Sequence, residues 1–447
     1  MSLTKVTYAM IKGMYVNVQD YGAKGDGITD DTAAIQAAID DAYAKFGDPN
    51  PGSGGDLHGL YDQYIVCFPG GKYIIKDKIT THYGTVLQGV PGPVGGYNPG
   101  TNSWVSFGTW ISVSDTKANG DTWTTTTLNN GHVYNGRACI DPDTTLVLQN
   151  INFYSENANA NYSTWLYCGD TTDTGRILQF HCTGVRVLNF ARGVYGSCFN
   201  DVFMQDTHFE SVQVCFGSVY SPYSQNNWTV NIVNGVFTAM DIFIAMGKIN
   251  NASMQISNCF VYGTNANTAN FISQNAATSN YSQRIQFSNC KFWSGHFRSE
   301  NNENVTYVTQ YLFSNCVFDE GYWHSGNANS QYTKSSKFDN CVFNNFPFTY
   351  TNWEAGSSIT NSMFEGTTTK ITIDGGVSYI FNGNDFSAIT YASEAPPIIN
   401  YTGAGPGGTS SQIITSNIFR DVGDVGGTGI GSVTDLIIRS NTLVADN

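Results

Sequence analysis

One four-residue pattern decides the fold: it reads Asn289-Cys290-Lys291-Phe292, Asn315-Cys316-Val317-Phe318 and Asn340-Cys341-Val342-Phe343. Two further copies are Asn258-Cys259-Phe260 and Asn361-Ser362-Met363-Phe364. The Asn positions of the five copies lie 31, 26, 25 and 21 residues apart. This repeat places Asn before inward-facing Cys, Val and Phe and shows no helical periodicity. It predicts an all-β fold, a right-handed, single-stranded parallel β-helix with one coil per copy.

Looser copies extend the repeat toward both ends of the chain: Asn150-Ile151-Asn152-Phe153, His181-Cys182, Asp206-Thr207-His208-Phe209, Asn234-Gly235-Val236-Phe237, Asn417-Ile418-Phe419 and Asn441-Thr442-Leu443. Each Asn should lie above the Asn of the previous coil at the ~4.8 Å strand spacing, so that the amides form a ladder at a turn. His181 is expected at this same turn position. The Cys residues should stack just inside the ladder as free thiols, because in-register parallel side chains lack the disulfide dihedral angle.

The composition supports the β-helix and excludes several alternatives. Only 13 Leu against 47 Gly disfavours a leucine-rich solenoid and long helices. A β-propeller remains open, although its repeats usually run nearer ~40 residues. A net charge of −14 without a Lys/Arg run argues against nucleic-acid or anionic-membrane partners. No apolar stretch approaches the ~18 residues that span a membrane. The chain has no Cys-x-x-Cys pair and no calcium-loop spacing, so we expect no metal or cofactor.

One segment predicts a helix, near the amino terminus. Asp30 and Asp31 offer cap residues, and apolar side chains recur at helical spacing from Ile35 to Phe46. We expect this helix to cap the β-helix. The predicted organisation is an N-terminal neck or lead-in segment at 1–20, a capping helix and loop at 21–60, and the parallel β-helix at 61–447.

Two short strands and a long loop are expected just after the cap. Residues 64–68 and 72–75 alternate apolar side chains around a Pro-Gly-Gly turn, which predicts strands. Residues 91–130 are rich in Gly, Thr and Trp with weak periodicity. We interpret them as a large surface loop.

The amino-terminal segment resembles a known family. Residues Val16–Ile39 read VNVQDYGAKGDGITDDTAAIQAAI, which is similar to the opening of pectate-lyase-superfamily β-helix proteins. Together with Tyr8–Gly13 before it, the segment most resembles bacteriophage tailspike polysaccharide depolymerases. Physically, Gly22, Gly25 and Gly27 permit tight turns ahead of a helix that can cover the open end of the solenoid.

The resemblance implies a homotrimeric spike that is made in the host cytoplasm and carried on the virion tail. Its partners would be a phage tail or baseplate protein and a bacterial surface polysaccharide (capsule, exopolysaccharide or O-antigen). A secreted or cell-surface bacterial protein is the alternative, although Met1 to Gly13 lacks the order of a secretory signal. The motif sets of polygalacturonases, pectate lyases and mannuronan epimerases are absent, so the resemblance assigns no catalytic residue.

Candidate catalytic residues follow the Phe of successive copies. Alignment on that Phe brings Trp293, Asp319-Glu320, Asn344 and Glu365 into one solvent-facing column. Glycoside hydrolysis needs two carboxyl groups, about 5 Å apart for retention or about 6.5–9.5 Å apart for inversion. We therefore predict Asp319, Glu320 and Glu365 as the acid/base residues. Asp319 and Glu365, two copies apart, suit inversion.

Two copies continue past this column with aromatic and charged side chains. The predicted substrate-binding residues are Trp293, His296, Arg298, Tyr322, Trp323 and His324. Aromatic faces would stack on sugar rings while the polar groups bond hydroxyls. The same cations and imidazoles could instead serve β-elimination on a uronate, which makes a polysaccharide lyase one alternative. A non-catalytic glycan-binding spike or adhesin is the other, because a fold does not fix a function.

A second candidate catalytic set lies on two earlier coils. It comprises Asp201, Asp206, Glu210 and Asp241. Fewer aromatic residues flank these carboxylates, so the set ranks below the first.

Overall fold

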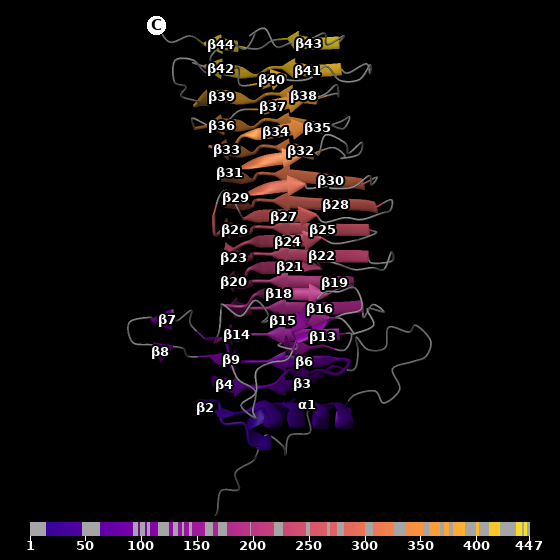
Figure 1. The fold of residues 1–447 in the computed structure, drawn as a ribbon, viewed down its shortest axis with the longest axis vertical. Helices are drawn as coiled ribbons and strands as arrows, with labels where there is room; N and C mark the ends of the chain where they lie inside the picture. The colour runs from indigo at the N-terminus through magenta and orange to yellow at the C-terminus, as the bar shows by residue number, and fades with distance from the viewer. Residues whose placement is uncertain are drawn as a thin grey trace, which may run out of the picture. The chain divides into compact units, whose positions relative to one another are not determined.

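Figure 1 shows the protein as a computed structural model, in which parallel strands are stacked rung upon rung. The structure describes residues 15–46, 63–92, 97–98, 103–104, 108–114, 125–127, 133–135, 138–142, 145–156, 164–168, 177–196, 198–218, 227–246, 251–265, 269–274, 281–299, 307–325, 336–351, 357–366, 371–374, 379–388, 399–401, 411–420, 435–439 and 442–444. The chain divides into two units, residues 1–212 and 213–447. In each unit the parallel strands form three hydrogen-bonded sheets. We call these sheets faces 1, 2 and 3, in the order in which the chain visits them within one coil.

In the first unit, strands alternate among the three faces as the chain coils. Face 1 contains β1 (Tyr15–Asn17), β3 (Tyr64–Cys67), β6 (Thr85–Gln88), β13 (Thr145–Gln149), β16 (Ile177–Thr183) and β19 (Cys198–Gln205). Face 2 contains β2 (Asp26–Asp30), β4 (Gly71–Ile75), β9 (Thr109–Val113), β14 (Ile151–Ser155), β17 (Arg186–Leu188) and β20 (His208–Glu210). Face 3 contains β5 (Ile79–Thr80), β12 (Ala138–Asp141), β15 (Thr164–Cys168) and β18 (Arg192–Gly196). Two antiparallel pairs join β7 (Tyr97–Asn98) to β8 (Ser103–Trp104) and β10 (Thr125–Thr127) to β11 (Val133–Asn135).

The second unit repeats the same three faces. Face 1 contains β22 (Asn227–Val233), β25 (Asn251–Ser257), β28 (Tyr281–Ser288), β30 (Tyr307–Ser314), β32 (Ser336–Asp339), β35 (Ser357–Thr360), β38 (Tyr379–Asn382), β41 (Ser411–Thr415) and β43 (Asp435–Arg439). Face 2 contains β23 (Val236–Met240), β26 (Phe260–Gly263), β29 (Lys291–Ser299), β31 (Val317–Ser325), β33 (Val342–Asn344), β36 (Met363–Glu365), β39 (Asp385–Ala388), β42 (Ile418–Arg420) and β44 (Thr442–Val444). Face 3 contains β21 (Val214–Ser218), β24 (Ile242–Met246), β27 (Asn270–Gln274), β34 (Phe348–Thr351), β37 (Ile371–Asp374) and β40 (Ile399–Tyr401), and the long β29 and β31 run on into it.

The predicted Asn ladder forms the turn between faces 1 and 2. Asn258, Asn289, Asn315, Asn340 and Asn361 all have φ between 51° and 54°, the left-handed region that Asn tolerates better than most residues. The amide of Asn289 donates to Asn258 at 3.2 Å, and that of Asn340 donates to Asn315 at 2.7 Å. The right-handed parallel β-helix is therefore confirmed, with its coils in the register that the repeat predicts.

Stacked side chains fill the interior behind the ladder. Phe318 is fully buried and stacks on Phe292 and Phe343, with ring centroids 5.2 and 5.0 Å apart. Cys290 and Cys316 lie just inside the Asn turn, where hydrogen bonding with the thiols of Cys290 and Cys341, together with burial, raises the pKa of the Cys316 thiol. The eight cysteines whose side chains the structure describes are free thiols, as predicted.

The helix α1 (Thr32–Phe46) covers the first coil, in contact with β1, β3 and the short 3₁₀ helix η2 (Val18–Tyr21). Its apolar face buries Ile35, Ala38, Ile39 and Ala42. The buried carboxylate of Asp31 accepts backbone N–H groups from Lys24 at 2.6 Å and Gly25 at 3.1 Å. The predicted cap is confirmed, and Asp31 organises the glycine-rich turn. No helix in the described residues combines the length and hydropathy needed to cross a membrane.

Three features differ from the sequence-based expectations. The segment 91–130 is not one loop, because β9 lies within it as a fully buried rung of face 2. The strand β1 pairs with β3, so the first rung lies inside the segment expected to lead into the fold. His181 does not occupy the Asn turn: it lies within β16, and Gly184 takes the turn with φ of 65°. The Gly at this position explains the difference, since it adopts the left-handed conformation at little cost.

Candidate functional site

The predicted catalytic column is one outward file on face 2 of the second unit. Strand pairing puts Tyr262 beside Trp293, Trp293 beside Asp319, Asp319 beside Asn344, and Asn344 beside Glu365. Each residue directly follows a buried position of its strand, so strand alternation turns it outward. The sequence therefore placed Trp293, Asp319, Asn344 and Glu365 in one file, as the strand pairing has them. Glu320 was expected in the file but lies beside it, and Tyr262 is a member that the alignment on Phe had not included.

The chain bends immediately after this file. Ser294, Glu320 and Asn345 follow Trp293, Asp319 and Asn344, and their φ angles are 55°, 53° and 49°. This second left-handed turn separates face 2 from face 3. It leaves Glu320 exposed beside the file, whereas an extended strand would have turned this side chain to the opposite side of the sheet.

Aromatic side chains form the amino-terminal end of the file. Trp293 is 37% exposed, and its ring centroid lies 5.0 Å from that of Tyr262 at an interplanar angle of 32°. The indole Nε1 donates to the Oε2 of Glu320 at 3.2 Å. This bond fixes the indole plane while leaving much of the ring in solvent. An exposed, immobilised ring is a surface on which a sugar can stack.

Asp319 lies in the middle of the file between two donors. The Nδ2 of Asn344 donates to its Oδ1 at 2.9 Å, and the Nζ of Lys291 lies 3.7 Å from its Oδ2. The same Nζ lies 5.7 Å from the centre of the Trp293 ring. Both partners orient the carboxylate. It can therefore accept a proton from a bound water molecule or a sugar hydroxyl.

Glu365 belongs to the same file, one rung beyond Asn344. Two rungs at ~4.8 Å place the backbones of Asp319 and Glu365 about 9.6 Å apart. This separation is close to the upper end of the ~6.5–9.5 Å range for carboxyl groups in inverting glycoside hydrolases. The intervening rung carries Asn344, whose amide bonds Asp319.

Two predicted substrate-binding residues are in fact buried, which corrects the sequence analysis. Trp323 is 3% exposed, and its ring packs 5.3 Å from that of Phe297 in the core. His296 is 2% exposed and stacks on Tyr322, with ring centroids 4.5 Å apart. The second bend is the cause, because it resets the alternation of inward and outward positions after Ser294. Tyr322, the stacking partner of His296, is half-exposed.

The side chains of Arg298 and His324 lie outside the described part of the structure. Their backbones pair with each other across β29 and β31 on face 3. Their predicted role in substrate binding therefore stays a prediction.

The second carboxylate set does not converge. Asp206 occupies an Asn-ladder turn with φ of 51°, whereas Glu210 lies at the other end of β20. Glu210 forms an ion pair with Arg186 at 2.7 Å, and the Nε2 of His208 lies 3.8 Å from the same Oε2 of Glu210. Asp241 belongs to the second unit, where its Oδ1 accepts from the Thr264 hydroxyl at 2.7 Å.

Sequence reasoning missed the basic partners in this second set. Asn152, Arg186 and His208 follow one another in register on face 2 of the first unit. Burial and the nearby Arg186 lower the pKa of His208 from its ordinary value of 6.5. Arg186 and His208 each stand one residue before an inward side chain, Val187 and Phe209. This shared position in the repeat was the sequence signal that could have paired them.

No group of three or more His, Cys, Asp or Glu side chains among the described residues is arranged to hold a metal ion.

A sequence model of one protein family matches residues 15–291, which is more than half of the chain. The family is described as rhamnogalacturonase A/epimerase, pectate lyase-like. The chain belongs to this family. The matched stretch ends at Lys291, so Trp293, Asp319 and Glu365 lie beyond it and membership of the rhamnogalacturonase A/epimerase family assigns them no role.

Curated relatives match only short stretches. The chain is 65% identical to mannuronan C5-epimerase AlgE4 of Azotobacter vinelandii over 70 residues, which is 15% of this chain and 11% of that protein. It is 40% identical to a glucan 1,3-beta-glucosidase of Cochliobolus carbonum over 78 residues, 17% of this chain and 9% of that protein. The chain thus spans only a small part of the length of these relatives.

A similar solved structure is the catalytic unit of a GH87 alpha-1,3-glucanase from Streptomyces thermodiastaticus. The TM-score is 0.47 with 12% identity, over 92% of this chain and 70% of that chain. At this TM-score and identity, the likeness carries no inference about the chemistry of this chain.

Proposed function

We propose that this protein is an endo-acting depolymerase that cleaves glycosidic bonds of a bacterial surface polysaccharide by carboxylate-pair hydrolysis. The observation that carries the proposal is the file on face 2, in which an exposed Trp293 adjoins Asp319 and, two rungs on, Glu365. Stacking on the indole would hold one sugar while the scissile bond lies over the carboxylates. Membership of a pectate-lyase-like family agrees with a polysaccharide substrate.

The two carboxyl groups receive different roles in this proposal. Asp319, held by Asn344 and Lys291, acts as the general base that removes a proton from the attacking water. Glu365 acts as the general acid that protonates the leaving oxygen. Their spacing of about two rungs suits direct displacement by water with inversion. Glu320 positions Trp293 through its 3.2 Å bond to the indole.

Hydrolysis is favoured over β-elimination by the position of His296. The imidazole is 2% exposed, so it cannot reach the α-proton of a uronate in solvent. Elimination at this site would have to use a base other than His296, whereas the carboxylates needed for hydrolysis lie on the outer surface.

The test is product analysis on purified capsule and lipopolysaccharide. Hydrolysis creates reducing ends without ultraviolet absorbance, whereas elimination creates reducing ends together with the absorbance of an unsaturated uronate. New reducing ends without absorbance support the proposal. Elimination products contradict the mechanism, and binding without cleavage identifies a non-catalytic glycan-binding protein.

We also propose that the protein works as a homotrimeric phage tailspike on the virion tail, a proposal that rests on the resemblance of residues 8–39. Sedimentation equilibrium should give three times the chain mass of 48.7 kDa. A mass of one chain would contradict the trimer.

A further inference from the structure

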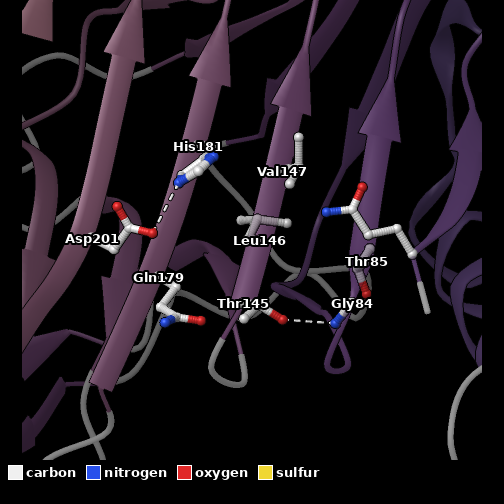
Figure 2. Close-up of a pocket in the computed structure, with 9 residues that line it drawn as sticks. Gly84, Thr85, Thr145, Leu146, Val147, Gln179, His181 and Asp201 are labelled. Atoms are coloured by element: carbon white, nitrogen blue, oxygen red, sulfur yellow. Dashed lines mark hydrogen bonds and ion pairs between the residues drawn. The ribbon is translucent and has the colours of Figure 1, made fainter. Parts of the chain in front are cut away.

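A second concave site lies on face 1 of the first unit, on different strands from the proposed catalytic file. Figure 2 shows it as a shallow pocket above β13, β16 and β19, with a volume of about 350 Å³ counted to its open mouth. The proposed hydrolysis does not use these residues, which lie within the stretch 15–291 that the family model matches.

Strand register explains which side chains line the pocket. Val147 pairs with His181, and Thr145 pairs with Gln179, so these four side chains stand in two adjacent outward files. The intervening Leu146 is 1% exposed and points mainly into the core. The floor of the pocket is therefore apolar at Val147 and polar on either side of it.

A β-bulge delivers the one carboxylate among the described residues that line the pocket. Leu178 pairs with Phe199 and Phe180 pairs with Val202, so that two residues, Asn200 and Asp201, oppose the single Gln179. Asp201 has φ of 65°, the left-handed conformation. Bulges of this kind re-aim a side chain. Here the bulge brings the Oδ2 of Asp201 to 3.4 Å from the Nε2 of His181, as Figure 2 shows.

The aromatic neighbour of His181 fixes its ring. Phe203 follows His181 in the same outward file and meets its imidazole edge to face, with centroids 5.9 Å apart. Across the pocket, the Oγ1 of Thr145 accepts the backbone N–H of Gly84 at 2.7 Å. Because this hydroxyl accepts from the backbone, its own proton is available to an acceptor.

The chemistry of the lining selects a neutral, hydroxyl-rich ligand. The pocket combines an apolar floor with a carboxylate, an imidazole, a hydroxyl and the amides of Gln63 and Gln179. A pyranose presents matching groups, with an apolar ring face and a rim of hydroxyls. No Lys or Arg is among the described residues that line the pocket, so nothing there would pair with a uronate or a phosphate.

We propose that this pocket is a separate, non-catalytic binding site for one neutral sugar residue. Asp201 and His181 bond its hydroxyls while the ring face rests on Val147. Hydrolysis is not assigned to the pocket, because it holds one carboxylate and glycosidic hydrolysis needs two. A depolymerase with such a site keeps hold of the glycan between cuts.

The test uses the full chain and a panel of methyl glycosides. Saturation-transfer NMR is recorded with the methyl glycosides of glucose, galactose, mannose and rhamnose, and with methyl glucuronide as the anionic counterpart. We expect transfer to at least one neutral glycoside and weaker transfer to the glucuronide. Asp201→Asn and His181→Gln should each weaken binding by about tenfold or more, the loss expected for a hydrogen bond to a charged group.

Two controls make the test specific. Asp40 forms a similar pair with His82, at 2.8 Å, outside the pocket, so Asp40→Asn should leave binding unchanged. Asp339→Asn, on face 1 of the second unit, should also leave it unchanged, because Asp339 belongs neither to the pocket nor to the proposed catalytic file. Circular dichroism verifies that each variant is folded.

Four outcomes would overturn the proposal. They are no transfer to any neutral glycoside, equal binding by the folded Asp201→Asn variant, loss of binding in Asp40→Asn, and loss of binding in Asp339→Asn. Failure of polysaccharide cleavage by the wild-type protein would leave this binding result intact, so the two proposals fail separately.

Discussion

The indole of Trp293 and the carboxylate of Glu320 are joined by a hydrogen bond of 3.2 Å across neighbouring rungs of face 2. The two residues belong to different coils, 27 positions apart in sequence. The left-handed bend at Glu320 makes the contact possible, because it keeps this side chain on the outer surface beside the ring. The pair therefore holds an aromatic surface in one orientation next to the acidic file.

Replacing Trp293 should weaken substrate binding more than catalysis. We expect Trp293→Ala to raise KM about tenfold, equivalent to about 1.4 kcal/mol, with kcat changed by less than about threefold. The KM of Trp293→Phe should lie between those of the wild type and Trp293→Ala, since this variant keeps a ring but loses the bond to Glu320. Steady-state kinetics on the cleaved polysaccharide measure both constants. An unchanged KM in Trp293→Ala would show that the ring does not contact the glycan.

Neutralising either proposed catalytic carboxylate should abolish most turnover. Asp319→Asn and Glu365→Gln keep the side-chain size but cannot exchange protons, so kcat should fall by about 10²–10⁴. Asp339→Asn is the matched control, because Asp339 lies on face 1, where its Oδ1 accepts from Thr360 and Asn361. It should retain activity. Full turnover by both test variants would remove the assignment.

The Asn ladder should matter through backbone conformation as well as through its amides. Asn315 has φ of 53° and accepts a bond from Asn340 at 2.7 Å. Asn315→Ala should destabilise the second unit by about 1–3 kcal/mol, from left-handed strain together with the lost bond. Asn315→Gly should cost less, since Gly carries no strain at this φ. Urea unfolding compares the two; equal losses would assign the whole effect to the side chain.

The fold could be predicted from the sequence because the repeat records a physical requirement at every coil. A left-handed turn favours Asn, the next inward position favours a small apolar side chain such as Cys, and the core favours Phe. These requirements produced the spacing that identified Asn289, Asn315 and Asn340 as neighbours. The helix was equally predictable, since its apolar stripe and its caps are local features.

The second bend could not be predicted as easily, because its residues share no type. Ser294, Glu320 and Asn345 all adopt positive φ, yet only Asn is typical of that conformation. Missing the bend gave the wrong orientation for His296 and Trp323. The glycines that follow Ser294 and Glu320 were the available signal, since Ser-Gly and similar pairs mark turns.

The bulge at Asp201 left no comparable trace. It arises because face 1 accommodates one extra residue between Phe199 and Val202, which strand alternation alone does not reveal. Asp201 was grouped with Asp206 and Glu210 because these residues lie close together in the sequence. The structure instead joins Asp201 to His181, one rung away.

The cluster of His208, Arg186 and Glu210 predicts a pH-dependent stability of the first unit. Burial and the charge of Arg186 lower the pKa of His208 below 6.5, and they outweigh Glu210, which acts in the opposite direction. An imidazole whose folded pKa is depressed adds stability above its unfolded pKa. This stability is lost as the pH falls below about 6.5, because the unfolded chain then takes up the proton more readily.

The measurement is hydrogen exchange of the peptides that cover β17 and β20 between pH 8 and pH 5, corrected for intrinsic rates. Wild-type protein should lose protection as the pH falls through this window, whereas His208→Gln should show a flatter dependence. His82→Gln is the matched control, since His82 also faces a carboxylate, Asp40, but lies against α1. NMR titration gives the decisive value, because an imidazole pKa for His208 at or above 6.5 would reverse the expected sign.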